Sequence, residues 1–503
     1  MSMSDWSEIE SHKEELRSLG KEQIAQRQAI LSTNLQQTYM LMLELEKKEL
    51  LLYGYSSEDR TQLYNYMASL KNWIAQAEVE LKLLQEVSLE LAEIEALAVS
   101  RLTLPPPSPP KEAVSLPTVT PYEGANSLPV SKKNLFVGRE PLLEQLKAFW
   151  GSDSPLAPVV LYGHKLMGKT SILYNLNLKE GSQDLPVVVE LSQVDSVETN
   201  ARFFYLIARE IEAKAKAAGF RTGDLSISEN FDTTANATTT MDDLLERLSR
   251  YMKKRRLILA LDSFDLLQHW IERHQIGTLV LEYLLEISHT YGWLALVFAG
   301  SNAMEEMRQD YRSLFYSNAK HLKVSYLEPE ATRKLITQPD SPDFALRYEP
   351  ALVEAIYGLT FGQPYLIQVL CNELVYQWND RWERNYKQLD PLLKITDLQP
   401  ALTDHFFERA SPYFEGVWKE VAPPGQKLMQ IVAQWQQKNR GPNGSLISIH
   451  TEEVEKLAGL NPTEFEQFYA TLSSHDLMQE ENGHLTFRTE LLRRWVVRQK
   501  TLT

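Results

Sequence analysis

The feature that most constrains this chain is a glycine-rich stretch at residues 163–170, with the pattern G-x-x-x-x-G-K-T, which follows an apolar run at residues 159–162. The next residues, 171–176, have the apolar spacing of an amphipathic helix. Between a strand and a helix, this pattern is typical of a loop that binds the phosphates of ATP or GTP, because glycines allow tight turns and N–H groups at the helix start face the anion. The predicted phosphate contacts are Gly163, His164, Lys165, Leu166, Met167, Gly168, Lys169, Thr170 and Ser171.

Two side chains of this loop are expected to contact the nucleotide and its Mg²⁺, in addition to the backbone N–H groups. Lys169 brings positive charge to the phosphates, and the Thr170 hydroxyl can bind Mg²⁺. A second partner for Mg²⁺ is expected where the apolar run at residues 256–262 ends in Asp262, because this run reads as a buried parallel strand. Since the carboxyl ends of parallel strands meet on the ligand side of a sheet, we predict that Thr170 and Asp262 hold Mg²⁺ together.

Further apolar runs, at residues 185–191, 293–302 and 321–327, alternate with helical stretches such as residues 203–217. This alternation predicts the α/β core of a P-loop NTPase, a parallel sheet with helices on both faces.

Composition limits the class of protein. The 503 residues carry a formal net charge of -15, which argues against a protein that coats nucleic acid, although a small local DNA contact stays open. The single cysteine, Cys371, cannot form an intramolecular disulfide, so we expect a reducing compartment. The N-terminus lacks an apolar signal core and no run is long enough to span a bilayer, so we expect a cytoplasmic protein without membrane contact.

Residues 134–140, which read Asn-Leu-Phe-Val-Gly-Arg-Glu, lie just before the phosphate loop. This stretch resembles the hhGRE box of AAA-like and STAND (signal-transduction ATPase with numerous domains) proteins, in which the box lies beside the adenine. The resemblance implies that the cofactors are ATP and Mg²⁺. It also implies that the base pocket is lined by Phe136, Val137, Gly138 and Arg139.

The residue after Asp262 departs from the family pattern, because AAA-like ATPases usually have glutamate there to polarise the attacking water and this chain has Ser263. Serine is not a comparable base at neutral pH. Asp265 either takes over this role or caps the following helix, and the sequence leaves both open. The family's sensor position falls at Ser301 or Asn302, where a polar side chain would contact the γ-phosphate or the water. We therefore expect an ATPase that converts ATP and water slowly to ADP and phosphate.

The segment Gly362-Gln363-Pro364 resembles the G-x-P motif of STAND ATPases, whose prolyl helix packs over the nucleotide and reports its state. Gly362 is suited to end one helix, and Pro364 to begin the next. The resemblance therefore adds both residues to the expected nucleotide contacts and places a helical lid at residues 328–422.

The C-terminal part, residues 423–503, reads as helix, short strand, two helices, a hairpin at Asn482-Gly483 and a closing helix. This order predicts a winged helix, and its ending at residues 489–495 resembles the F-R-x-x-L-L-R-R-W ending of these ATPases. The candidate recognition helix begins at Pro462 and is acidic, so we expect an intramolecular regulatory role rather than DNA reading.

The N-terminal part, residues 1–103, has few helix breakers and predicts two long helices that fold back about Gly54. An apolar stripe on the second helix is typical of a coiled-coil seam. A lone hairpin buries little, so we favour an interaction module, with a simple spacer as the alternative. The proline-rich segment 104–131 predicts a stiff linker that separates the hairpin from an ATPase core at residues 132–327. The stripe consists of Leu63, Met67, Leu70, Ile74, Ala77, Leu81, Leu84, Val87, Leu91 and Ile94, facing Leu31, Leu35, Met42 and Leu45.

These patterns together predict a STAND-type switch in which ATP or ADP sets the conformation. Its output would be homo-oligomerisation or recruitment of an effector protein through the hairpin, in bacterial signalling or defence. The alternative is a DNA-associated AAA-like regulator of the transposition or replication-initiation type, and a third reading is a scaffold that needs nucleotide only for stability.

Overall fold

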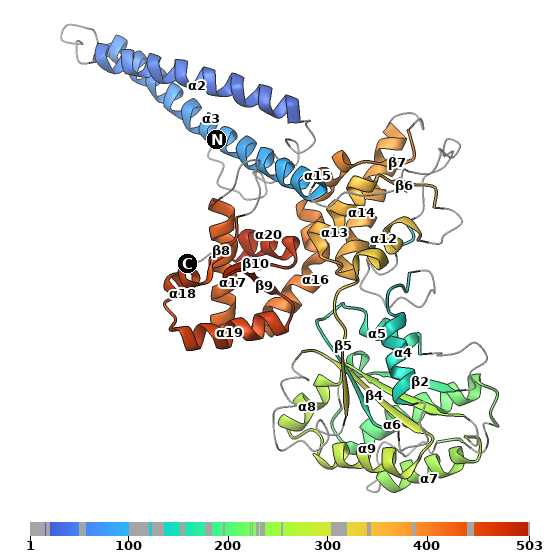
Figure 1. Cartoon of the computed structure of the whole chain (residues 1–503). Helices are drawn as coiled ribbons and strands as arrows, with labels where there is room; N and C mark the ends of the chain where they lie inside the picture. The colour runs from blue at the N-terminus through green and yellow to red at the C-terminus, as the bar shows by residue number, and fades with distance from the viewer. Residues whose placement is uncertain are drawn as a thin grey trace.

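Figure 1 shows a helical hairpin, a sheet with helices on both faces, a group of lid helices and a C-terminal module with a small sheet. The structure is a computed structural model. It describes residues 16, 21–49, 57–99, 120–122, 135–150, 156–176, 184–194, 197–221, 223, 225–227, 231, 237–252, 255–302, 319–339, 344–384, 389–439 and 447–500.

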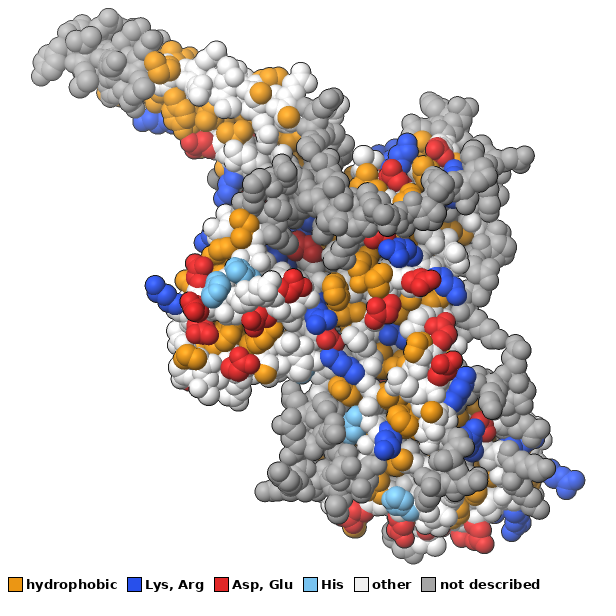
Figure 2. Space-filling view, viewed as in Figure 1, with side chains coloured by type: hydrophobic (Ala, Val, Ile, Leu, Met, Phe, Trp, Pro, Cys, Tyr) orange, Lys and Arg blue, Asp and Glu red, His pale blue; other side chains and the backbone are white. Residues whose placement is uncertain are grey.

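The hairpin consists of α2 (Lys21–Glu49) and α3 (Ser57–Val99), which lie antiparallel and project away from the rest of the chain (Figure 1). Buried stripe residues of α3 meet α2 at two places, where Met67 and Ile74 pack with Met42 and Leu45, and Leu84 and Val87 pack with Ile24. In the second cluster the seam buries Leu83 where the sequence predicted Leu81, which is only half-buried. Apolar side chains also remain on the hairpin surface (Figure 2). The turn at Gly54 and the side chains of Leu63, Leu91 and Ile94 lie outside the described residues.

The hairpin contacts the rest of the chain at one end, through helices that lie outside the expected ATPase core. The C-terminal end of α3 lies against two lid helices, α13 (Pro350–Thr360) and α15 (Leu398–Ala401). Tyr122, from the expected linker, is 1% exposed, and its hydroxyl lies 2.9 Å from the Ile336 carbonyl and 2.8 Å from the Tyr348 hydroxyl. The linker is therefore anchored to the lid helices at this residue.

The five-stranded parallel sheet has the order β2-β3-β4-β1-β5 and confirms the predicted fold class. Its central strands β3 and β4 are buried at every position, which explains their uninterrupted apolar sequences. The chain leaves the sheet earlier than the predicted run at residues 321–327. The strands are β1 (Val159–Tyr162), β2 (Leu185–Glu190), β3 (Leu257–Asp262), β4 (Leu294–Gly300) and β5 (Lys320–Lys323).

Alternate residues of each strand face opposite layers, as the pleat requires. Leu257, Leu259 and Leu261 join the core under α6, α7 and α9, whereas Ile258 and Ala260 join the core under α4 and α5. The sheet is therefore covered on both faces. The helices here are α4 (Glu140–Phe149), α5 (Lys169–Tyr174), α6 (Asn200–Ala217), α7 (Ala237–Ser249), α8 (Asp265–Glu272) and α9 (Leu279–Thr290).

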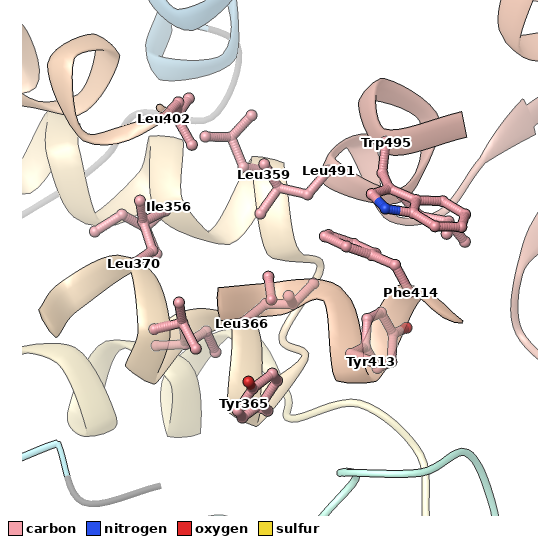
Figure 3. Packing of buried hydrophobic residues seen from close by; sticks show 14 of the residues in the cluster. Ile356, Leu359, Tyr365, Leu366, Leu370, Leu402, Tyr413, Phe414, Leu491 and Trp495 are labelled. Carbon is pink, nitrogen blue, oxygen red and sulfur yellow. The ribbon is translucent and has the colours of Figure 1, made fainter. Parts of the chain in front are cut away.

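The lid helices and the C-terminal module share one hydrophobic core. Figure 3 shows Leu366 and Phe414 of the lid beside Leu491 and Trp495 of the module, and the Phe414 and Trp495 rings stack with centroids 5.6 Å apart. Besides α13 and α15, the lid contains α12 (Pro329–Thr337), α14 (Pro364–Arg384) and α16 (Asp404–Glu420), with the short strands β6 (Arg347–Tyr348) and β7 (Leu392–Leu393).

The C-terminal module has its elements in the order expected from the sequence, with an antiparallel sheet ordered β8-β10-β9. The predicted hairpin turn is confirmed, because Asn482 and Gly483 have φ values of 54° and 78°, as a tight two-residue turn requires. The elements are α17 (Pro423–Lys438), β8 (Ile449–His450), α18 (Thr451–Ala458), α19 (Pro462–Ser474), β9 (Met478–Glu481), β10 (His484–Phe487) and α20 (Glu490–Gln499).

Within the described part of the chain, no helix combines the length and the apolar character that crossing a membrane requires.

Candidate functional site

The glycine-rich loop connects β1 to α5 and brings its two functional side chains to the carboxyl edge of the sheet. The Lys169 ammonium donates to the carbonyls of Gly163 at 2.8 Å and His164 at 2.7 Å. The Thr170 hydroxyl donates to Asp262 Oδ2 at 2.6 Å, at the end of β3. Thr170 and Asp262 thus lie together, with the oxygen ligands that Mg²⁺ prefers.

The two glycines of the loop serve different purposes. Gly168 has a φ of 91° and open space on its Cβ side, so only its backbone conformation calls for glycine. A Cβ on Gly163 would lie 2.4 Å from the Val324 carbonyl oxygen, so glycine here allows the loop to approach the chain that leaves β5.

A cavity of about 610 Å³ opens beside the loop, a volume within the range of small-molecule sites. The residues that line it include the acidic Glu190, Asp262, Asp265 and Glu420, together with basic residues of the loop and the hhGRE box. The predicted contacts that line it are Phe136, Val137, Arg139, Lys165, Leu166, Met167, Gly168, Lys169, Thr170, Ser171, Asp262, Asp265 and Pro364.

Other predicted contacts do not line this cavity. Gly138 packs on α12, since a Cβ there would lie 2.4 Å from the Ala331 Cβ. Gly163 faces Val324, and Gly362 faces Leu327, whose backbone N–H donates to the Gly362 carbonyl at 2.8 Å. His164 and Asn302 are both 2% exposed and contact each other beside the loop.

The hhGRE box and the G-x-P motif hold neighbouring carbonyls of the loop. The Arg139 guanidinium donates to Met167 O at 3.0 Å, and burial lowers the pKa of Arg139 to about 10. The Gln363 amide donates to Leu166 O at 3.1 Å. Sequence reasoning missed Gln363, because it occupies the variable position of the motif.

The two carboxylates near the end of β3, those of Asp262 and Asp265, have different hydrogen-bond partners. Burial raises the pKa of Asp262, while the Thr170 hydrogen bond and the Lys169 charge act in the opposite direction. Asp265 is the first residue of α8 and does not cap it, so the N-cap interpretation is wrong. Its Oδ1 instead accepts the backbone N–H of Ser301 at 3.3 Å, which ties α8 to the end of β4. Ser263 between them has a φ of 58°.

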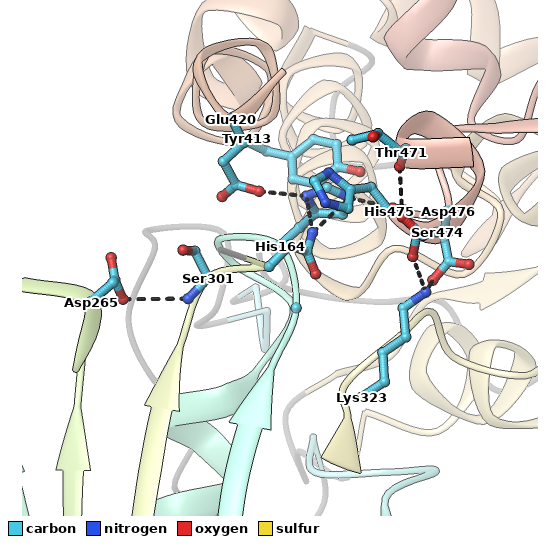
Figure 4. Close-up of polar contacts among 12 residues, drawn as sticks. His164, Asp265, Ser301, Lys323, Tyr413, Glu420, Thr471, Ser474, His475 and Asp476 are labelled. Carbon is cyan, nitrogen blue, oxygen red and sulfur yellow. Dashed lines mark hydrogen bonds and ion pairs between the residues drawn. The ribbon is translucent and has the colours of Figure 1, made fainter. Parts of the chain in front are cut away.

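A polar network joins the loop to the lid and to the C-terminal module (Figure 4). The His164 ring contacts Glu420 Oε2 at 3.0 Å and the His475 carbonyl, and the Asn302 amide nitrogen lies 3.1 Å from the same ring. Burial, and to a smaller extent the nearby His164, lower the pKa of the His475 side chain to about 4. Sequence reasoning missed Glu420 and His475, since they lie 256 and 311 residues from His164.

Asp476 makes a second connection between the module and the sheet. Its carboxylate lies 2.6 Å from the Lys323 ammonium at the end of β5 and accepts the Ser325 hydroxyl at 2.9 Å. The Tyr326 hydroxyl donates to the Asp476 carbonyl at 3.1 Å. Like the contact of the Lys323 ammonium with the Ser474 carbonyl, these contacts of the module are polar.

Among the residues that the structure describes, no group of three or more His, Cys, Asp and Glu side chains could hold a metal. A Mg²⁺ ion bound with phosphates needs no such group, because water and phosphate oxygens supply most of its ligands.

No protein-family model and no curated sequence matches this chain, but solved structures match its fold. A Walker-type ATPase of Pyrococcus abyssi is 14% identical, with a TM-score of 0.50 and coverage of 74% of this chain and 98% of that one. An ORC2 protein of Aeropyrum pernix is also 14% identical, with a TM-score of 0.38 and coverage of 71% and 91%. A RuvB variant of Thermotoga maritima is 13% identical, with a TM-score of 0.32 and coverage of 73% and 96%. The parallel sheet and the likeness to the Pyrococcus abyssi structure together show the α/β fold of a P-loop NTPase.

Proposed function

We propose that this chain is an ATP-dependent molecular switch of the STAND type, in which ATP and Mg²⁺ alter the contact between the phosphate loop and the C-terminal module. The position of His164 carries the proposal. This loop residue is 2% exposed and contacts both Glu420 of the lid and the His475 backbone of the module. A phosphate group bound at the loop would therefore lie beside the contact that joins the loop to the lid and to the C-terminal module.

The groups around the cavity suit a nucleoside triphosphate. Backbone N–H groups at the start of α5 and the Lys169 ammonium would bind the phosphates. Thr170 and Asp262 would hold Mg²⁺, which supplies positive charge that offsets the phosphates when bound. Phe136 and Val137 offer an apolar wall for the base, and Pro364 brings the start of α14 to the same cavity.

Glu420 gives this site a means to distinguish ATP from ADP. Its carboxylate lines the cavity close enough for its charge to act on Lys169. A third phosphate at Lys169 would bring negative charge towards Glu420, and like charges repel strongly in a partly buried site. We infer that ATP weakens the Glu420–His164 contact more than ADP does, which releases the module from the loop.

Domain roles follow from this proposal. We assign the ATPase core to residues 132–327, the lid to 328–422 and a winged helix to 423–503. The hairpin at 1–103, with its linker at 104–131, would carry the output by binding a second copy or an effector. Ser263 at the position of the usual glutamate favours slow hydrolysis, below the roughly 1–100 s⁻¹ of phosphoryl-transfer kinases.

The alternative function, a DNA-associated AAA-like regulator, requires a surface that meets phosphates. The candidate recognition helix α19 instead exposes Glu464 and Glu466 and has no Lys or Arg among residues 462–474. Fluorescence anisotropy with duplex DNA, with and without ATP, tests this alternative. Tight binding at physiological salt would favour it over the switch.

Amide hydrogen exchange tests the switch itself. A non-hydrolysable ATP analogue with Mg²⁺ should increase exchange at residues 470–478, around the His475 contact, more than ADP does. Lys169→Ala should abolish this response and lower the affinity for ATP by about 10- to 100-fold, because it removes a charged partner of the phosphates. Lys334→Ala, on the exposed face of α12, is the matched control and should behave as the wild type. Unchanged exchange at residues 470–478 under saturating analogue would contradict the proposal.

A further inference from the structure

The carboxylate that would act on the attacking water cannot come from residue 263. Ser263 follows Asp262 directly, and its φ of 58° turns the chain sharply away from the strand. This left-handed conformation is unfavourable for a residue with a side chain. Apart from Asp262, two acidic residues line the cavity on this side, Asp265 and Glu190.

Asp265 already has a structural task. Its Oδ1 accepts the backbone N–H of Ser301, and this contact holds the start of α8 against the end of β4. This contact fixes the Asp265 carboxylate towards Ser301.

Glu190 is better placed than Asp265 to act on the attacking water. It is the last residue of β2, and it pairs in register with Asp262 in the neighbouring parallel strand. Paired residues of adjacent strands lie about 4.8 Å apart and point to the same face of the sheet. Asp262 in turn accepts the Thr170 hydroxyl at 2.6 Å, so Glu190 lies next to the position expected for Mg²⁺ and the terminal phosphate.

A second contact orients Glu190 from the loop helix. The Tyr174 hydroxyl, on α5, donates to Glu190 Oε1. Because α5 begins at Lys169, the helix that would bind the phosphates also positions this carboxylate. Glu190 therefore connects the edge strand, the loop helix and the cavity.

We propose that Glu190 is the catalytic carboxylate for ATP hydrolysis, replacing the residue that would follow Asp262, with Tyr174 as its positioning residue. The inference rests on the proposed nucleotide binding. A water oxygen forms a bond to the γ-phosphorus while the bond from that phosphorus to the β–γ bridging oxygen breaks. The electron pair of the broken bond leaves with ADP, and the proton of the water passes to Glu190 and then to solvent.

Single-turnover hydrolysis of ATP with Mg²⁺ by the full chain tests the inference. Glu190→Gln keeps the shape and the oxygen that accepts from Tyr174 but cannot take a proton, so the rate should fall by about 100-fold or more while ATP affinity is retained. Glu282→Gln, exposed on α9, is the matched control and should keep the wild-type rate. Tyr174→Phe should lower the rate less than Glu190→Gln does, with ATP affinity unchanged.

Chemical rescue separates a catalytic from a structural role. Added formate should restore part of the rate to Glu190→Ala, because a small carboxylate can occupy the space of the missing one. Three outcomes overturn the inference alone: ATP binding without phosphate release by the wild type, an unchanged rate in Glu190→Gln, or a larger loss in Asp265→Asn. Failure of the wild type to bind ATP in calorimetry would refute the proposed function and the inference with it.

Discussion

His475 is a buried histidine, and its burial is the main factor that opposes its protonation. Its side chain is 5% exposed, and burial with the nearby His164 lowers its pKa from 6.5 to about 4. The charged groups that face it also include Glu420, Lys323 and Asp476. At a pH between these two pKa values, the unfolded chain binds more protons at this residue than the folded chain does. Lowering the pH through this range therefore favours unfolding.

We expect the free energy of unfolding to fall by up to about 3 kcal/mol through His475 as the pH drops from about 6.5 to about 4. Urea denaturation of the wild type and of His475→Gln across this range measures the effect, and the variant should lose this part of the pH dependence. The carboxylate of Glu490 adds little to the pH dependence of the free energy of unfolding in this range. Burial raises its pKa, but Arg493 and Arg494 outweigh this and lower it to about 2, so its contribution is lost mostly at lower pH. An identical pH dependence in both proteins would show that His475 is not responsible.

The elements differ in how well the sequence predicts them, and the range of their interactions explains why. Strands β3 and β4 and the loop before α5 follow from local patterns, because apolar runs and glycine spacing act over a few residues. The contacts of His164 with Glu420 and His475 join residues far apart in the chain, so no local pattern encodes them.

Some sequence predictions fail because they depend on contacts with a neighbouring helix or strand. The heptad spacing on α3 predicted Leu81 in the seam, but the packing against α2 buries Leu83. The sequence left open whether Asp265 acts on the attacking water or caps a helix, and the cap is wrong because its carboxylate accepts the Ser301 N–H just after β4. In both cases a partner on another element decides between positions that the local sequence makes equivalent.

The turn between α13 and α14 depends on a glycine for two reasons. Gly362 has a φ of 81°, and a Cβ there would lie 2.1 Å from the Leu327 carbonyl oxygen. Gly362→Ala should therefore destabilise the chain by roughly 3 kcal/mol or more, because the backbone after β5 must move. Gly219→Ala is the matched control, with a φ of 80° and open space around its Cβ position, and should cost about 1–2 kcal/mol. Chemical denaturation measures both, and equal losses would show that the close approach to Leu327 is unimportant.

At the scale of the whole molecule, two kinds of contact decide which parts move together. The lid helices and the C-terminal module share a continuous hydrophobic core, which is costly to open. The module meets the sheet through polar contacts of His475 and Asp476, which water can replace at low cost. A switching motion would therefore move the lid and module as one body relative to the sheet, with a hinge near residues 324–328.

Such a motion would also carry the hairpin, because α3 lies against α13 and α15 of the same body. Helix α2 exposes Ile30, Met40 and Leu41, which fall within roughly 100° of arc on a helix. Fully burying such a side chain contributes roughly 1.5–3 kcal/mol, so two hairpins from separate copies would gain by pairing along this face. We therefore predict that the full chain self-associates with a non-hydrolysable ATP analogue and stays monomeric with ADP, as light scattering can measure.

The substitutions Ile30→Lys and Met40→Lys should abolish this association without loss of stability, because both side chains are exposed, by 55% and 62%. Tyr376→Lys provides the matched control, since Tyr376 is 67% exposed but lies on α14 and not on the hairpin, and this variant should associate like the wild type. Association that persists in the α2 variants would place the interface elsewhere on the molecule. A chain that is monomeric with both nucleotides would make the hairpin a spacer, because its exposed apolar face would then have no second copy to bind.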